Sequence, residues 1–350
     1  MQKRECMRYL VVILIFAAAA QGGYRRPSQP LVCAVALTQL TVQSKNPFLI
    51  TTPRWALEHS RKTVEEVATL VAPLPLPSEL TITVHPPRSR LSVRTASTIV
   101  GYSHINAPSR YLGNRLDGRT VSVALVHEMG HKVASTQMLA DFLNEPQVVE
   151  DSKQSFTIPK DLIGKFLRER INDEVTYTLP FHAKLKVFGE RSYAGTEAEQ
   201  FIWAYLSSEV VMAYEEIFGD LLAAIHTKNQ SAVSDLLRQD NFSNREHIPE
   251  SLISSRSFVK PLEPVKRPPD IYDFFSEVRW ELGQSYLDKG FEDPEYANRL
   301  INVFYKTMRY CIFDHYKSSE EYLEQVNQDK ANEKFLSEFK RLMAESEVSN

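Results

Sequence analysis

The stretch VALVHEMGHKV, residues 123–133, constrains the fold most because it puts two histidines and a glutamate into an otherwise apolar run. A buried polar or charged group costs free energy unless it has a partner. On a helix, residues i and i+4 lie on the same face, so His127 and His131 can meet one metal ion. Glu128 lies one residue further round, close to the open side of such an ion. The stretch therefore predicts a buried helix that carries a metal site.

The spacing is that of the H-E-x-x-H arrangement, in which two histidines bind zinc and the glutamate is the general base for a metal-bound water. Neutral imidazole combined with carboxylate oxygen suits zinc, and a catalytic zinc site keeps one position open. The alternative is a surface helix that carries its two histidines by chance, but the apolar residues 123–126 argue against it. Gly130 costs about 1 kcal/mol relative to alanine inside a helix. It predicts that another backbone packs closely there.

A third zinc ligand is expected from the stretch EVVMAYEEIFGDLLAAI, residues 209–225. This stretch is otherwise apolar, and a buried helix does not normally carry charged residues unless they have a role. Glu216 and Asp220 are four residues apart and share a helix face. We expect Glu216 to bind the metal and Asp220 to hydrogen-bond a ligand histidine. Glu209 is a weaker ligand candidate because no aspartate follows it at i+4. In the alternative, Glu215 and Glu216 face water and Asp220 makes a salt bridge.

HEMGH followed downstream by Glu216-x-x-x-Asp220 resembles the gluzincin class of zinc metallopeptidases. The two motifs lie closer together in thermolysin-like members. Ste24/HtpX-like peptidases have a comparably wide gap and a glycine inside the first motif, but their second motif usually reads E-x-x-A-D where this chain has Gly219, and they are often membrane-embedded. The resemblance implies one Zn²⁺ per chain on His127, His131 and Glu216, with Glu128 as base.

The class also implies a tyrosine or histidine that stabilises the oxyanion of the reaction. Tyr205, Tyr214 and His247 are the candidates, and the sequence does not choose among them. The implied activity is that of a zinc-dependent endopeptidase acting on a peptide or protein substrate. Two alternatives stay open: a zincin-like binding or scaffold protein that holds zinc without cleaving, and a zinc hydrolase that acts on other substrates. A metal-free helical binding module is a further alternative, in which the histidines are incidental.

The order of elements predicts an α+β fold of zincin-like type, with a small N-terminal β-sheet followed by a mostly helical body that carries the active-site helix. We expect an N-terminal segment with one helix over 21–79, a catalytic core over 80–228 with an inserted helical region at 146–195, and a helical C-terminal region over 229–350. The expected elements are helices at 53–71, 120–142 and 196–226, strands at 80–85, 90–95 and 97–104, and a loop at 106–118. The strand at 97–104 is a candidate edge for pairing with an extended substrate.

The N-terminus predicts export. MQKRECMR is basic, YLVVILIFAAAA is apolar, and small residues precede Gln21, which is the order of a signal peptide over residues 1–20. The protein is then periplasmic or secreted, or anchored at the membrane surface by an uncleaved signal. The mature chain holds no apolar run of about 20 residues that could span a bilayer.

The remaining thiols of the mature chain, Cys33 and Cys311, form a disulfide or stay as buried free cysteines. A formal net charge of −3 without a basic cluster argues against a nucleic-acid partner.

Overall fold

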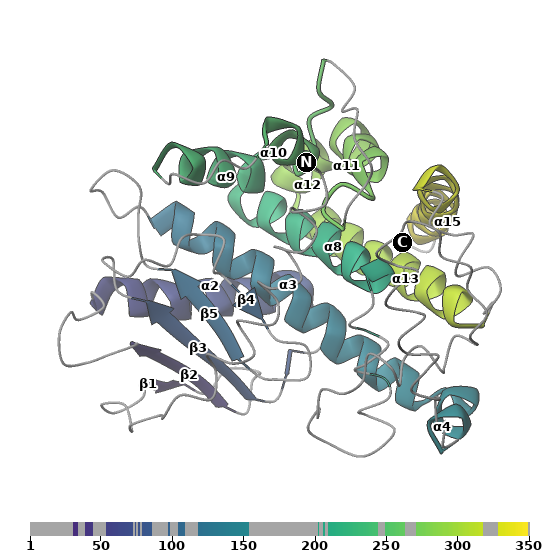
Figure 1. The fold of residues 1–350 in the computed structure, drawn as a ribbon, viewed down its shortest axis with the longest axis horizontal. Helices are drawn as coiled ribbons and strands as arrows, with labels where there is room; N and C mark the ends of the chain where they lie inside the picture. Colours follow the sequence, from purple (N-terminus) through teal and green to yellow (C-terminus); the bar gives the residue numbers. More distant parts are fainter. Residues whose placement is uncertain are drawn as a thin grey trace, which may run out of the picture.

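The structure, a computed structural model, describes residues 31–33, 39–44, 54–72, 74, 76–77, 79–85, 97–98, 104–108, 118–153, 202, 206, 209–243, 249–262, 271–317 and 328–348. Within them the chain forms one small sheet and then a body made of helices (Figure 1). This order agrees with the predicted α+β arrangement.

The sheet has five strands in the order β1-β2-β3-β5-β4. The three inner strands run parallel, and the two edge strands pair antiparallel to them. The strands are β1 (Leu31–Cys33), β2 (Gln39–Ser44), β3 (Glu79–His85), β4 (Ser97–Thr98) and β5 (His104–Pro108).

Helix α2 (Arg54–Val71) connects the parallel strands β2 and β3, because parallel neighbours need a long crossover. Its buried residues Val64, Val67 and Val71 recur at helical spacing, so one face of the helix is apolar. In β3, the apolar residues Leu80, Ile82 and Val84 recur with the two-residue period of a strand and are almost fully buried, and Thr83 between them is buried as well. Both elements therefore bury the residues that their sequence patterns select.

The helical body begins with α3, which runs between the sheet and the other helices (Figure 1). Its elements are α3 (Gly118–Leu143), α4 (Pro146–Lys153), α8 (Glu209–Thr227), α9 (Ala232–Ser243), α10 (Glu250–Ser255), α11 (Ser276–Leu282), a π-helical segment at Gly283–Leu287, α12 (Asp288–Glu292), α13 (Pro294–Lys317) and α15 (Gln328–Val348).

Helices α3 and α8 form the centre of the molecule and the largest helix–helix contact among the described elements. Nearly every residue of α8 from 211 to 225 is buried, as expected of a helix that is apolar all round. One hydrophobic cluster joins α2, the sheet, α3, α8, α13 and α15. Residues before and after the predicted boundary between 228 and 229 belong to this cluster.

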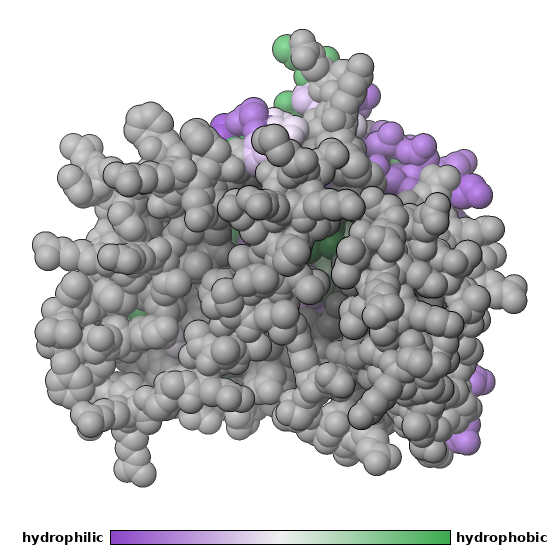
Figure 2. All heavy atoms as spheres, in the orientation of Figure 1, coloured by the Kyte–Doolittle hydropathy of each residue, from purple (hydrophilic) through white to green (hydrophobic). Residues whose placement is uncertain are grey.

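Helix α15 covers the C-terminal side of this core as an amphipathic helix. Phe335, Phe339 and Met343 are buried on one face, while polar residues face outward. Figure 2 shows hydrophilic side chains over this helix, and apolar atoms at the top of the view, where the chain after α10 projects. Val259 and Leu262 of that chain are exposed.

The predicted helices at 53–71 and 120–142 and the strand at 80–85 are confirmed within a residue or two. The segment 97–104 is not one strand: β4 takes up its first two residues, and its last residue begins β5, which lies inside the sheet between β3 and β4. The predicted loop at 106–118 was also wrong at its start, because residues 106–108 pair with β3. The predicted signal peptide, the strand at 90–95 and residues 154–195 of the insertion lie outside the described residues.

Candidate metal centre

The two motifs meet where α3 and α8 touch through their glycines. A Cβ on Gly130 would lie 2.5 Å from Cα of Gly219, and a Cβ on Gly219 would lie 2.6 Å from Nδ1 of His127. No side chain fits at either position without moving a backbone or the His127 ring. The close backbone approach predicted from Gly130 is confirmed, and Gly219 is its counterpart on α8.

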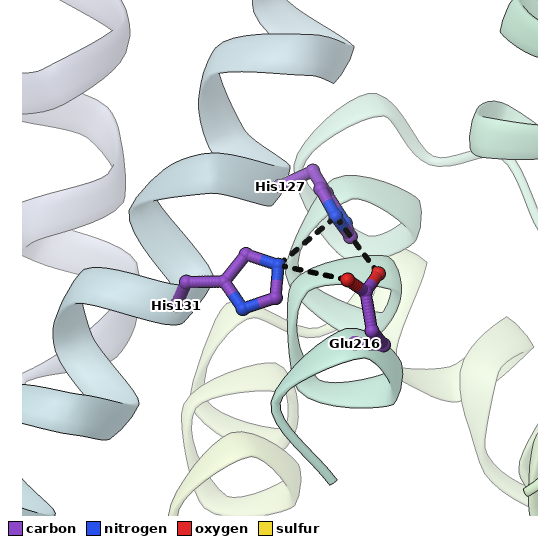
Figure 3. Close-up of side chains that lie close together, drawn as sticks. All are labelled: His127, His131 and Glu216. Carbon is purple, nitrogen blue, oxygen red and sulfur yellow. Dashed lines mark hydrogen bonds and ion pairs between the residues drawn. The ribbon is translucent and has the colours of Figure 1, made fainter. Parts of the chain in front are cut away.

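Each helix carries polar groups three residues before and one residue after its glycine. On α3 these are His127 and His131 around Gly130, and on α8 they are Glu216 and Asp220 around Gly219. Because i and i+4 share a helix face, both pairs point into the space beside the crossing. Figure 3 shows that the side chains of His127, His131 and Glu216 point toward one another from the two helices.

Four atoms with lone pairs converge at this point, the Nε2 atoms of the two histidines and both carboxylate oxygens of Glu216. Nε2 of His127 lies 3.2 Å from Nε2 of His131 and 3.3 Å from Oε2 of Glu216. Nε2 of His131 lies 3.6 Å from Oε1 of Glu216. Tetrahedral zinc with bonds of about 2.0–2.1 Å requires ligand atoms about 3.3–3.4 Å apart. The pair of Nε2 atoms matches such an edge, and with Glu216 the three residues could hold one ion, since one ligand atom of each lies within 4.8 Å of the others.

The other ring nitrogen of each histidine faces a carboxylate. Oδ1 of Asp220 lies 3.2 Å from Nδ1 of His127, and Oε2 of Glu215 lies 3.4 Å from Nδ1 of His131. A carboxylate next to Nδ1 favours the tautomer that carries its proton there, which leaves the Nε2 lone pair free for a ligand. The Asp220 carboxylate therefore lies beside the ring of His127, and its role toward a metal ligand stays a prediction.

Two buried arginines converge on Asp220. Arg256 donates from Nε to Oδ2 at 2.8 Å and from Nη2 to Oδ1 at 2.5 Å. Arg279 donates from Nε to Oδ2 at 2.9 Å and approaches the same oxygen with Nη2 at 2.7 Å. The exposed fractions are 1% for Asp220, 6% for Arg256 and 0% for Arg279. The predicted alternative of an Asp220 salt bridge is thus also present, together with the contact to His127.

The electrostatics of the three converging residues favour a bound positive charge. Burial lowers the pKa of His127, but Asp220 and Glu216 outweigh it and raise the pKa to about 9. Burial raises the pKa of Glu216, but Arg256 and His131 outweigh it and lower the pKa to about 2. At neutral pH Glu216 is therefore ionised, and His127 holds a proton when no other cation is present.

Glu128 lies on α3 beside the three converging residues and is buried. Burial raises its pKa, and the positive charges of His131 and His127 oppose this change. The neighbouring Lys132 is buried too, and burial lowers its pKa to about 8 against the opposite effect of Glu215 and Glu128. Glu128 is not among the three groups that could share an ion.

Of the three oxyanion candidates, only Tyr214 lies among the described residues. Tyr214 lies two residues from Glu216, about 200° round the helix, and its ring packs against Phe275 at 4.3 Å in the hydrophobic core. The structure therefore places Tyr214 away from the converging atoms. Tyr205 and His247 lie outside the described residues, and so does the side chain of Glu209.

Three residues of the site were missed by sequence reasoning. Glu215 was given no role in the expected site and faced water only in the alternative interpretation; it is 2% exposed and lies beside His131. Its only signal was its position on an apolar helix. Arg256 and Arg279 lie 36 and 59 residues after Asp220, and no local pattern links them to it. A buried, charged Asp220 requires basic partners. The sequence therefore indicated that such partners exist, but it did not indicate which residues they are.

No family model matches the chain, and no curated protein and no solved structure is significantly similar to it. Among the described residues, no helix combines the length and the apolar character needed to cross a membrane.

Proposed function

We propose that this protein is a zinc-dependent hydrolase, and more specifically an exported endopeptidase that acts on a peptide or protein substrate. One observation carries the proposal: His127, His131 and Glu216 each present one ligand atom within 4.8 Å of the others, and the two imidazole Nε2 atoms are 3.2 Å apart, close to the edge of a zinc tetrahedron. Three protein ligands leave a fourth position open, as in catalytic rather than structural zinc sites. The peptidase class and the zincin-like fold rest on the motif resemblance, and export rests on the predicted leader.

The residues of the site have distinct roles in this proposal. His127, His131 and Glu216 would hold the ion, while Asp220 and Glu215 orient the two imidazole rings. A bound zinc ion would acidify a water molecule and polarise the carbonyl group of a substrate. Glu128 is the proton acceptor, because its raised pKa brings the carboxyl group closer to neutral pH, where such a group both takes up and returns a proton.

The ligand set is tested by the zinc content of the purified full chain, measured by elemental mass spectrometry for the wild type and for Glu216→Ala. We expect close to one zinc per wild-type chain and a large loss of zinc in the variant, because a ligand is removed. A folded wild-type protein without stoichiometric metal would contradict the proposal and favour a metal-free helical module.

The chemistry is tested separately with Glu128→Gln, which keeps the size of the side chain but removes its ability to accept a proton. We expect zinc content to stay at the wild-type level while cleavage of a proteome-derived peptide mixture falls on the order of 10²- to 10⁴-fold. Cleavage that survives this change would rule out Glu128 as base. Stoichiometric zinc without any cleavage by the wild type would favour the binding or scaffold alternative, or a hydrolase of other substrates.

A further inference from the structure

The backbone around Arg256 is fixed on both sides. Arg256 follows the last turn of α10, and its N–H donates to the carbonyl of Ile253. Two residues later, the N–H of Phe258 donates to the carbonyl of Gln230 at 3.0 Å, and the Phe258 side chain is buried. The Tyr272 ring lies 5.0 Å from the guanidinium carbon. Arg256 therefore enters the centre from a rigid segment.

One nitrogen of Arg256 bridges both carboxylates of the α8 motif. Nη2 lies 2.5 Å from Oδ1 of Asp220 and 3.1 Å from Oε2 of Glu216. The same nitrogen is 3.4 Å from Nε2 of His127. Oε2 of Glu216 thus lies against the Arg256 guanidinium and 3.3 Å from Nε2 of His127, whereas Oε1 lies 3.6 Å from Nε2 of His131 and is not the oxygen paired with Arg256. The two oxygens of this carboxylate are in different surroundings before any metal is added.

We propose that Arg256 is a positioning residue that makes Glu216 a single-oxygen metal ligand, by holding Oε2 and leaving Oε1 for the ion. This inference rests on the proposed metal site. A carboxylate that binds zinc through both oxygens would fill the coordination position that a reacting group needs, since catalytic zinc keeps a position open. The ion pair with Arg256 keeps that position free.

Arg279 is a natural control for this role. It is as deeply buried as Arg256 and binds the same Asp220, so either arginine neutralises that carboxylate. Of the two arginines, both within the described part of the chain, only Arg256 forms an ion pair with Glu216. A purely structural role predicts equal consequences for the two sites, whereas a positioning role predicts a difference at the metal.

The test compares Arg256→Met with Arg279→Met in the full chain, and Arg256→Lys with Arg279→Lys as milder pairs that keep the charge. Zinc affinity is measured by competition with a chromophoric chelator. Each protein is also loaded with cobalt(II), whose visible absorption weakens when the coordination number rises from four to five. Circular dichroism verifies that each variant is folded. If a methionine variant does not fold, the two lysine variants are compared instead.

We expect Arg256→Met to weaken zinc binding about 10- to 100-fold, the usual effect of removing a partner of a ligand, and to weaken the cobalt absorption as Glu216 binds through both oxygens. Arg256→Lys should do the same to a smaller extent, because one ammonium group cannot hold both carboxylates in the same geometry. The Arg279 variants should keep the wild-type spectrum. Equal changes at both arginines, or none at Arg256, would overturn the inference and leave the proposed function standing. A wild-type protein that takes up neither zinc nor cobalt would remove both.

Discussion

Asp220 is the residue on which the buried charges of the centre depend, because His127, Arg256 and Arg279 all lie against its carboxylate. Burial raises its pKa, but the two arginines outweigh it and hold the pKa well below its ordinary value. The side chain is therefore ionised at neutral pH. Its removal would leave two buried guanidinium groups without their shared partner.

Asp220→Asn should therefore lower the free energy of unfolding by about 3–5 kcal/mol, the usual cost of breaking a buried ion pair by removing one partner. Denaturant unfolding in the presence of a chelator measures this effect without a contribution from metal binding. Asp235→Asn is the control, because its ion pair with Arg238 is exposed and should contribute at most about 1 kcal/mol. Similar losses for the two variants would mean that the Asp220 network contributes little to stability.

His127, His131, Glu216 and Asp220 could be found from the sequence because each is a polar residue at i and i+4 on a helix that is otherwise apolar. That signal is local and needs no knowledge of the fold. Arg256 could not be found in this way, since it lies in a stretch rich in serine and proline where an arginine is unremarkable. Only tertiary packing brings it within 3.1 Å of Glu216.

At the scale of elements, the centre depends on how closely α3 and α8 approach. Two glycines allow the helices to touch backbone to backbone, and this contact sets the distance between the imidazoles and Glu216. Helix propensity favours alanine over glycine by about 1 kcal/mol in a helix interior, so the glycines are present in spite of their cost to each helix. The sequence indicated this for Gly130, but the partner position could not be chosen before the crossing point was known.

Gly130→Ala should consequently destabilise the protein by about 1–2 kcal/mol in spite of the better propensity of alanine, because overpacking a tight contact costs about 1–3 kcal/mol. Gly290→Ala is the matched control: it lies in α12, and its added Cβ would meet its nearest atom at 3.6 Å. We expect that change to stabilise by about 0.5–1 kcal/mol. Chemical denaturation of both variants measures the difference, and a stabilised Gly130→Ala would mean that the helices are not in backbone contact.

At the scale of the whole molecule, residues of β3, β5, α2, α3, α8, α13 and α15 share one hydrophobic cluster. Residues from the expected catalytic core and from the expected C-terminal region meet in the same interior, and the latter region supplies both arginines of the centre. Composition and periodicity predicted the order of elements, a sheet and then helices. They could not predict that the two regions form one core, because each helix shows only that it has an apolar face and not which helix covers it.

Cys311 reports on this shared core. It is a buried free thiol on α13, and burial raises its pKa to about 12. At pH 8 its thiolate fraction is on the order of 10³-fold below that of an unfolded cysteine with a pKa of about 8.5. Alkylation of Cys311, followed by peptide mass spectrometry, should be slow in the folded protein and should rise about tenfold per pH unit below a pKa of about 12. In denaturant, labelling should appear together with the loss of helical circular dichroism. Labelling well before that loss would show that the C-terminal helices open on their own.

The contact between Gly130 and Gly219 also determines which motions the centre tolerates. Both motifs place their ligands within one turn of this contact, whereas α3 extends 13 residues beyond it to Leu143, a distance of about 20 Å. If the two helices rock by about 5° around the contact, a ligand about 5 Å away moves by about 0.5 Å, while the far end of α3 moves by nearly 2 Å. With the glycine contact as the centre of such a rotation, the ligand atoms would move about a quarter as far as the end of α3, so the separations within the site are the least sensitive to it.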